Sequence, residues 1–135
     1  MIILVLFGLI PILMPIVSQY EGEFFPVVRN VEIVEVELES ESPELGIVVE
    51  VMFDKVRACE FIAIRWFDRY GGTVPVLFEP DLEEIEVTPV FTRPVMDGQR
   101  AGQWKLIGLD ELEGSVAIVS HRCNPLWLTY TRFYP

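Results

Sequence analysis

The sequence predicts an all-β fold, an antiparallel β-sandwich, preceded by a hydrophobic N-terminal helix. The first observation is a series of about seven or eight short apolar runs, separated by turn residues every 8–15 positions or so. The second is an opening segment of eighteen residues without a charged side chain. The third is length: 135 residues is one domain's worth, and the roughly 110 that follow the apolar segment suit a sandwich. A small closed β-barrel is the alternative.

Composition and charge argue against a disordered chain and against a nucleic-acid-binding protein. With 51% hydrophobic and 23% charged residues, the chain is too apolar to be disordered. Ten Lys and Arg against 21 Asp and Glu leave a net charge of −11, which repels a phosphate backbone. We therefore expect no nucleic-acid partner.

The N-terminal segment MIILVLFGLIPILMPIVS predicts export. As a helix it would reach about 26 Å, slightly less than the ~30 Å hydrocarbon core of a bilayer. The first charges after it are the acidic Glu21 and Glu23, so nothing positive retains the downstream chain in the cytoplasm. The end of the segment is a poor match to a small-x-small cleavage site, so the sequence does not decide whether the segment is removed after export. The expected organisation is a signal peptide or membrane anchor (1–18), a linker (19–30) and the β-sandwich (31–135). The alternative is that the N-terminal segment is a buried core strand or helix of a larger assembly.

Two alternating runs open the predicted sandwich. In V-E-I-V-E-V-E-L-E, residues 31–39, valine and leucine alternate with glutamate in the period-2 pattern of a half-buried strand. The phase breaks at Ile33-Val34, which predicts a β-bulge there. Residues 47–53 alternate again after a turn that contains Pro43 and Gly46.

The next run, residues 57–68, is apolar on both faces, as is typical of a central strand. Tyr70-Gly71-Gly72-Thr73 predicts a hairpin that leads into a strand over residues 74–78. A further strand is expected at residues 85–88, and Pro89 places it at a sheet edge.

The later part of the chain begins with the longest predicted loop, residues 93–102, because Pro94, Asp97-Gly98 and Gly102 fall within it. A strand is expected at residues 104–107, a turn at residues 110–114 and an interior strand at residues 116–121. Pro125 then predicts a kink before a short final strand.

The two cysteines, Cys59 and Cys123, stand at the ends of apolar runs. In an exported protein such a pair is usually a disulfide, and the alternative is two buried free thiols. Together with His121 they would still be short of a structural zinc site, so no metal is expected.

Immunoglobulin domains have a Trp after the first Cys and a Tyr two residues before the second. Here Trp66 follows Cys59 by seven positions, but residue 121 is His. We therefore expect immunoglobulin or fibronectin type III character in the architecture alone.

Catalytic signatures are missing from the sequence. No G-x-S-x-G, H-E-x-x-H, P-loop or G-x-G-x-x-G motif occurs, so we expect no catalytic residue, no cofactor and no enzymatic activity. His121, in S-H-R-C-N-P, is the only imidazole base. Its position at a strand end is more typical of a structural residue, and a small hydrolase that uses His121 with a nearby carboxylate is the alternative.

The densest aromatic group is Trp127, Tyr130, Phe133 and Tyr134. If exposed, these side chains would form a stacking platform for a glycan or a protein partner; if buried, they would close the core. In either case we expect the C-terminal stretch to belong to the folded domain.

The run SHRCNPLWLTYTRFYP, residues 120–135, resembles the ends of small uncharacterised exported proteins encoded in bacteriophage and marine bacterial genomes. This resemblance implies a virion, envelope or host-surface context. The expected function is an exported or membrane-anchored structural or binding protein. Its expected partners are a protein or envelope component and, through residues 1–18, a membrane. The alternative is a small carbohydrate-binding module that uses Trp127 and Tyr130.

Overall fold

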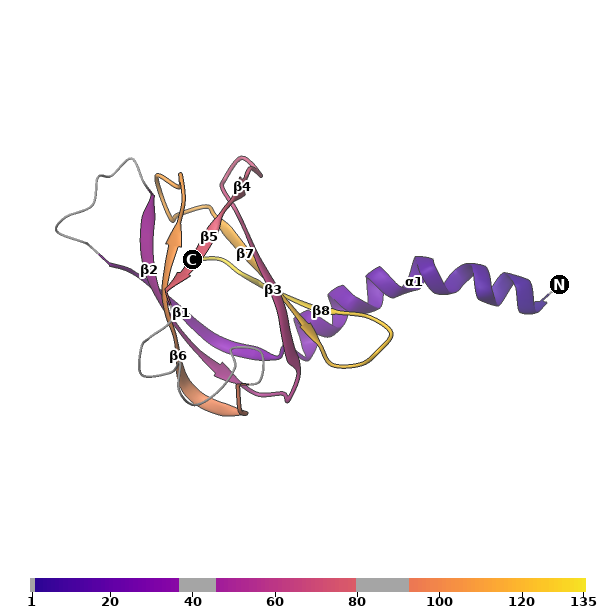
Figure 1. Ribbon diagram of the computed structural model, residues 1–135. Coiled ribbons are helices and arrows are strands. Elements are labelled where there is room, and N and C mark those ends of the chain that lie inside the picture. Colours follow the sequence, from indigo (N-terminus) through magenta and orange to yellow (C-terminus); the bar gives the residue numbers. More distant parts are fainter. Residues whose placement is uncertain (1, 37–45, 80–92) are drawn as a thin grey trace.

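The computed structural model describes residues 2–36, 46–79 and 93–135 (Figure 1). Its strands form two four-stranded antiparallel sheets, ordered β1-β2-β6-β5 and β4-β3-β7-β8, which pack together and do not close into a barrel. This confirms the predicted β-sandwich and excludes the barrel alternative. The elements are α1 (Ile2–Phe24), β1 (Val28–Val36), β2 (Ile47–Lys55), β3 (Glu60–Phe67), β4 (Thr73–Val74), β5 (Val76–Glu79), β6 (Met96–Leu106), β7 (Val116–Arg122) and β8 (Thr129–Phe133).

The core lies between the two sheets. Val49 and Leu106 contribute from the first sheet, and Trp66 and Ala117 from the second, each at most 1% exposed. The Trp66 indole N–H donates a hydrogen bond of 3.0 Å to the Ser115 hydroxyl, so its polar end is satisfied inside the core. Full burial of a large apolar side chain such as Val49 or Leu106 stabilises the fold by about 1.5–3 kcal/mol.

The central strands match the predictions. β3 lies between β4 and β7, and β7 lies between β3 and β8, so both have a partner on each side. The predicted hairpin at residues 70–73 joins β3 to β4, and the Asp68 carboxylate accepts backbone N–H bonds from Tyr70 and Gly72. The predicted turn at residues 110–114 is also present.

The loop predicted at residues 93–102 is wrong over most of its length, because β6 begins at Met96 and pairs with both β2 and β5. Gly98 and Gly102 have φ angles of 67° and 83°, a left-handed conformation that is typical of turns. Here the pairing of β6 with β2 shifts register twice and so accommodates irregular backbone within a strand. The Gly98 N–H is held by the Asp54 carboxylate at 2.7 Å.

Two further details differ from the predictions. The bulge expected at Ile33-Val34 lies earlier, between Arg29 and Glu32, where Asn30 has a φ of 49°. The single strand expected at residues 74–78 is divided at Pro75, because β4 belongs to one sheet and β5 to the other. The strand predicted at residues 85–88 lies outside the described residues.

The N-terminal helix is longer than the predicted apolar segment. α1 continues to Phe24 and β1 begins at Val28, so helix and strand occupy much of the stretch expected to be a linker, residues 19–30. The helix projects from one end of the sandwich, and its N-terminus lies far from the sheets (Figure 1). Within the described part of the chain, no helix combines the length and apolar character needed to cross a membrane.

Candidate functional site

The last turns of α1 pack on β8, the edge strand of its sheet. The Ser18 hydroxyl donates a hydrogen bond to the Leu128 carbonyl oxygen. At Gly22 the two backbones come so close that a Cβ would lie 1.6 Å from the Tyr130 carbonyl oxygen. Only glycine permits this approach, and the helix thereby covers part of an edge that is otherwise open to pairing.

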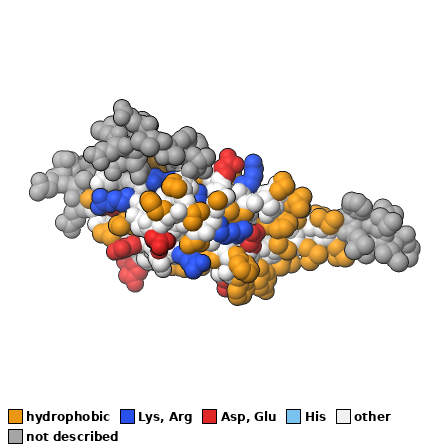
Figure 2. Space-filling view, turned by 90° about the horizontal axis from the view of Figure 1, so that it is seen from below, with side chains coloured by type: hydrophobic (Ala, Val, Ile, Leu, Met, Phe, Trp, Pro, Cys, Tyr) orange, Lys and Arg blue, Asp and Glu red, His pale blue; other side chains and the backbone are white. Residues whose placement is uncertain are grey.

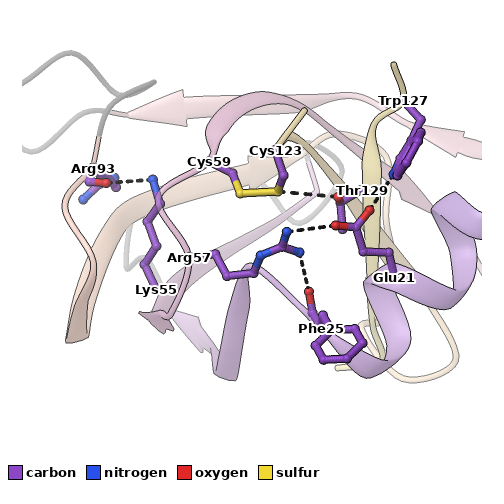
Figure 3. The surroundings of a disulfide bond; sticks show 9 residues. All are labelled: Glu21, Phe25, Lys55, Arg57, Cys59, Arg93, Cys123, Trp127 and Thr129. Atoms are coloured by element: carbon purple, nitrogen blue, oxygen red, sulfur yellow. Dashed lines mark hydrogen bonds and ion pairs between the residues drawn. A yellow bond between two sulfur atoms is a disulfide. The ribbon is translucent and has the colours of Figure 1, made fainter. Parts of the chain in front are cut away.

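Glu21 is the centre of the junction between helix and sandwich (Figure 3). One carboxylate oxygen accepts a hydrogen bond of 2.8 Å from the Arg57 guanidinium, and the other accepts 2.6 Å from the Trp127 indole N–H. Arg57 also donates to the Phe25 carbonyl oxygen, just beyond the helix, at 2.8 Å. One carboxylate therefore joins the helix to the β2–β3 connection and to the segment before β8.

The junction favours the ionised form of Glu21, whose side chain is 16% exposed. Burial alone would raise the pKa of Glu21, but hydrogen bonds from Trp127 and Arg57, together with the Arg57 charge, outweigh burial and hold the pKa below its usual value. The carboxylate is therefore charged at neutral pH, when its charge-assisted hydrogen bonds are strongest.

A disulfide supports the junction from the sandwich side. The sulfurs of Cys59 and Cys123 are 2.13 Å apart, so the predicted pairing is confirmed. The bond links the start of β3 to the end of β7, which are neighbours in one sheet, whereas the immunoglobulin disulfide links two sheets. The fully buried Thr129 hydroxyl lies 3.5 Å from the Cys123 sulfur (Figure 3). Because Arg57 is two residues from Cys59, the disulfide also restrains the backbone that carries the arginine.

The predicted aromatic group does not form one platform. Trp127 is half-buried and bonded to Glu21, whereas Phe133 packs against the core. Tyr130 is 39% exposed and Tyr134 is 74% exposed. The four side chains are thus divided between the helix contact, the core and solvent.

His121 lies inside the sandwich and is 3% exposed. Its ring meets Phe61 edge-on, with the ring centroids 5.9 Å apart. Burial and the nearby charge of Lys55 lower the pKa of His121 to about 4, so the imidazole is neutral at pH 7. Burial also lowers the pKa of Lys55, with a contribution from Arg93. No three His, Cys, Asp or Glu side chains among the described residues are grouped to hold a metal ion.

The part of α1 that precedes the junction exposes apolar side chains. Tyr20 and Phe24 continue this surface with stacked rings 6.0 Å apart. Figure 2 shows hydrophobic side chains along the projecting helix. The large apolar side chains of its described part that are 41–63% exposed are Leu9, Ile10, Ile12, Leu13, Ile16 and Val17.

The chain matches no family model, no curated protein and no solved structure. Its function must therefore be inferred from its own residues. Sequence reasoning did not single out Glu21 and Arg57 as partners. The only signal was that Glu21 is the first charged residue after the apolar segment.

Proposed function

We propose that this protein is an exported β-sandwich that acts by binding, as a structural component of an envelope or virion, and that α1 anchors it in a membrane. The observation that carries this proposal is an apolar, exposed helix fixed to the sandwich by specific polar contacts. The buried position of His121 favours binding over hydrolysis, because a general base must reach its substrate.

The junction supports retention of the helix. Ser18 bonds to β-sandwich backbone, Glu21 joins two separate segments, and Gly22 lies directly on β8. A signal peptide that is removed has no need of such contacts. The disulfide is consistent with the oxidising side of a membrane, where such bonds persist.

The exposed helix surface supports the choice of lipid as its environment. Contiguous apolar patches above a few hundred Å² are rare on soluble monomers and mark interaction sites. The apolar run is followed by exposed aromatic side chains, Tyr20, Phe24 and Phe25, which are typical of the membrane–water interface. The first charged group, Glu21, is paired with Arg57 at this same level. The proposed boundary of the anchor therefore lies near residues 18–20.

The test is membrane fractionation of the full-length chain with an alkaline wash. Ile12→Asp combined with Leu13→Asp places two charges on the exposed helix, and we expect this variant to move to the soluble fraction. The matched control, Val34→Asp with Leu77→Asp, places the same charges on exposed strand positions and should remain with the wild type in the membrane pellet. A wild-type protein found in the soluble fraction would contradict the anchor.

A further inference from the structure

The outer face of the β4-β3-β7-β8 sheet carries three exposed arginines, Arg65, Arg122 and Arg132, which we call the arginine face. Arg65 on β3 and Arg132 on β8 flank Ile118 of β7 in one row of the pairing register, about 10 Å apart at the usual strand spacing. Arg122 lies four residues beyond Ile118 along β7. None of the three guanidinium groups has an ion pair or hydrogen bond with any residue that the structure describes.

The other basic side chains of the chain are engaged. Arg57, Arg69 and Arg100 are in ion pairs, Lys55 and Arg93 donate to backbone carbonyl oxygens, Arg29 stands opposite Asp54 in the β1–β2 register, and Lys105 also has an interaction. The strands of the β4-β3-β7-β8 sheet contain one acidic residue, Glu60, against the three arginines, which leaves a formal charge of +2. The whole protein has a net charge of −11. The unpartnered positive charge of the described residues is therefore gathered on one sheet face.

The chemistry of the arginine face suits a protein partner that carries carboxylates. Guanidinium groups match carboxylates in geometry and charge. The half-buried Ile118 and Val116 and the exposed Tyr130 lie on the same face as the arginines. Arginine and aromatic side chains are enriched in protein–protein interfaces. We therefore expect an acidic protein surface to bind here.

β8 runs alongside the last turns of α1, which sets the height of the arginine face above the proposed membrane. Ser18 contacts Leu128 and Gly22 contacts Tyr130, so helix and strand run in the same direction. Arg132 is four residues beyond Leu128, and therefore about 13 Å beyond the proposed end of the anchor near residues 18–20. The polar headgroup layer on each side of a bilayer is about 5–8 Å thick and does not reach this height. The face is therefore placed to meet a neighbouring protein and not the lipid.

The chain itself offers a matching acidic surface on the edge strand β1. Residues 30–54 contain eight acidic and no basic residues. Within the described part of this stretch, Glu32 and Glu35 are exposed and make no ion pair with described residues. Val34, which is 51% exposed, lies between them. This order of charged, apolar and charged side chains matches the row of Arg65, Ile118 and Arg132.

The acidic surface and the arginine face lie at the same height. Val31 of β1 and Phe133 of β8 pack against the same two groups of buried core residues. Glu32 follows Val31 and Arg132 precedes Phe133, so these two charged side chains are at about one level along the sandwich. Two copies anchored in one membrane can therefore bring the two surfaces together without a change of depth.

We propose that the arginine face binds the acidic β1 surface, Glu32, Val34 and Glu35, of a second copy of this chain. The inference rests on the proposed membrane anchor, which places both surfaces at one height. Two arginine faces would repel each other, so the contact joins unlike surfaces and each copy keeps one surface of each kind for a further copy. Such contacts build rows or rings, as a structural component requires.

The experiment is sedimentation velocity of the full-length protein in a non-ionic detergent. The wild type should form assemblies at about 0.1 M salt and dissociate at about 1 M, because the screening length falls from about 10 Å to about 3 Å. Arg65→Glu with Arg132→Glu, and separately Glu32→Arg with Glu35→Arg, should each raise the dissociation constant at least about hundredfold, about tenfold for each reversed charge.

Mixing provides the decisive measurement. The two double variants, combined in equal amounts, should associate again, because the two reversed surfaces are complementary. The matched control, Asp110→Arg with Glu113→Arg, makes the same change in net charge as the β1 variant at two exposed positions of the turn before β7, and should associate as the wild type does. All substituted positions are exposed, so the melting midpoints should equal that of the wild type.

The proposal is overturned if the wild type is monomeric at about 0.1 M salt, if either double variant associates as the wild type does, or if the mixture does not associate. A monomeric wild type that binds heparin, when the double arginine variant does not, would assign the face to an anionic glycan. Flotation of the protein with phosphatidylcholine vesicles tests the anchor separately. A wild type that floats but is monomeric in detergent overturns the contact alone, and one that associates but does not float overturns the anchor alone.

Discussion

Removal of the disulfide is the sharpest perturbation of this fold. Cys59 and Cys123 are separated by 64 residues, so their bond closes a long loop in the unfolded chain. The loop-entropy relation gives about 4 kcal/mol for a loop of this length, as an upper value. We therefore expect Cys59→Ala with Cys123→Ala to lower the free energy of unfolding by about 2–4 kcal/mol. The total free energy of unfolding of a typical domain is about 5–15 kcal/mol, so this loss would be a large fraction of the stability.

The assay is urea unfolding followed by tryptophan fluorescence. The wild type, the double alanine variant and the chemically reduced wild type are compared. Reduction leaves every side chain in place, so agreement between the reduced protein and the variant assigns the loss to the bond and not to a cavity at the buried Cys59. The thermal midpoint should fall by about 10 °C or more.

The reasoning is refuted if the variant and the wild type differ by less than about 0.5 kcal/mol, a size typical of neutral surface changes. It also fails if protein from an oxidising compartment titrates with two free thiols per chain. The intact mass should be about 2 Da below that of the reduced chain, since disulfide formation removes two hydrogens.

Three other perturbations have defined outcomes. Gly22→Val should displace α1 from Tyr130 and lower the melting midpoint by several degrees, whereas Gly8→Val, where a Cβ meets nothing within 4 Å, should not. The pKa of His121 is about 4 in the folded protein and about 6.5 in an unfolded chain, so the unfolded state takes up a proton first as the pH falls. The free energy of unfolding should therefore fall between about pH 6.5 and pH 4, by up to about 3 kcal/mol. His121→Leu should flatten this part of the pH profile measured by urea unfolding. Deletion of residues 126–135 removes β8 and should prevent soluble folding, and a truncated protein that melts as the full chain does would contradict this.

The strands that the sequence predicted best are those with a strong local pattern. β3 and β7 are apolar enough to be interior, and the Gly71-Gly72 hairpin fixes the end of β3. β6 was mostly missed because its glycines and Pro94 are local turn signals. Hydrogen bonding to β2 on one side and β5 on the other outweighs these preferences, and a partner strand leaves no trace in the segment's own periodicity.

The sequence by itself determined the charge-free N-terminal segment, and it predicted the sandwich class, the central strands and the pairing of Cys59 with Cys123, which the structure confirms. Only the tertiary structure decided that Glu21 meets Arg57 and Trp127, and that β6 pairs with both β2 and β5. These partners are 36 and 106 positions from Glu21 along the chain. Periodicity and turn preferences act over a few residues, whereas such contacts depend on how the two sheets and the helix pack, so no local pattern encodes them.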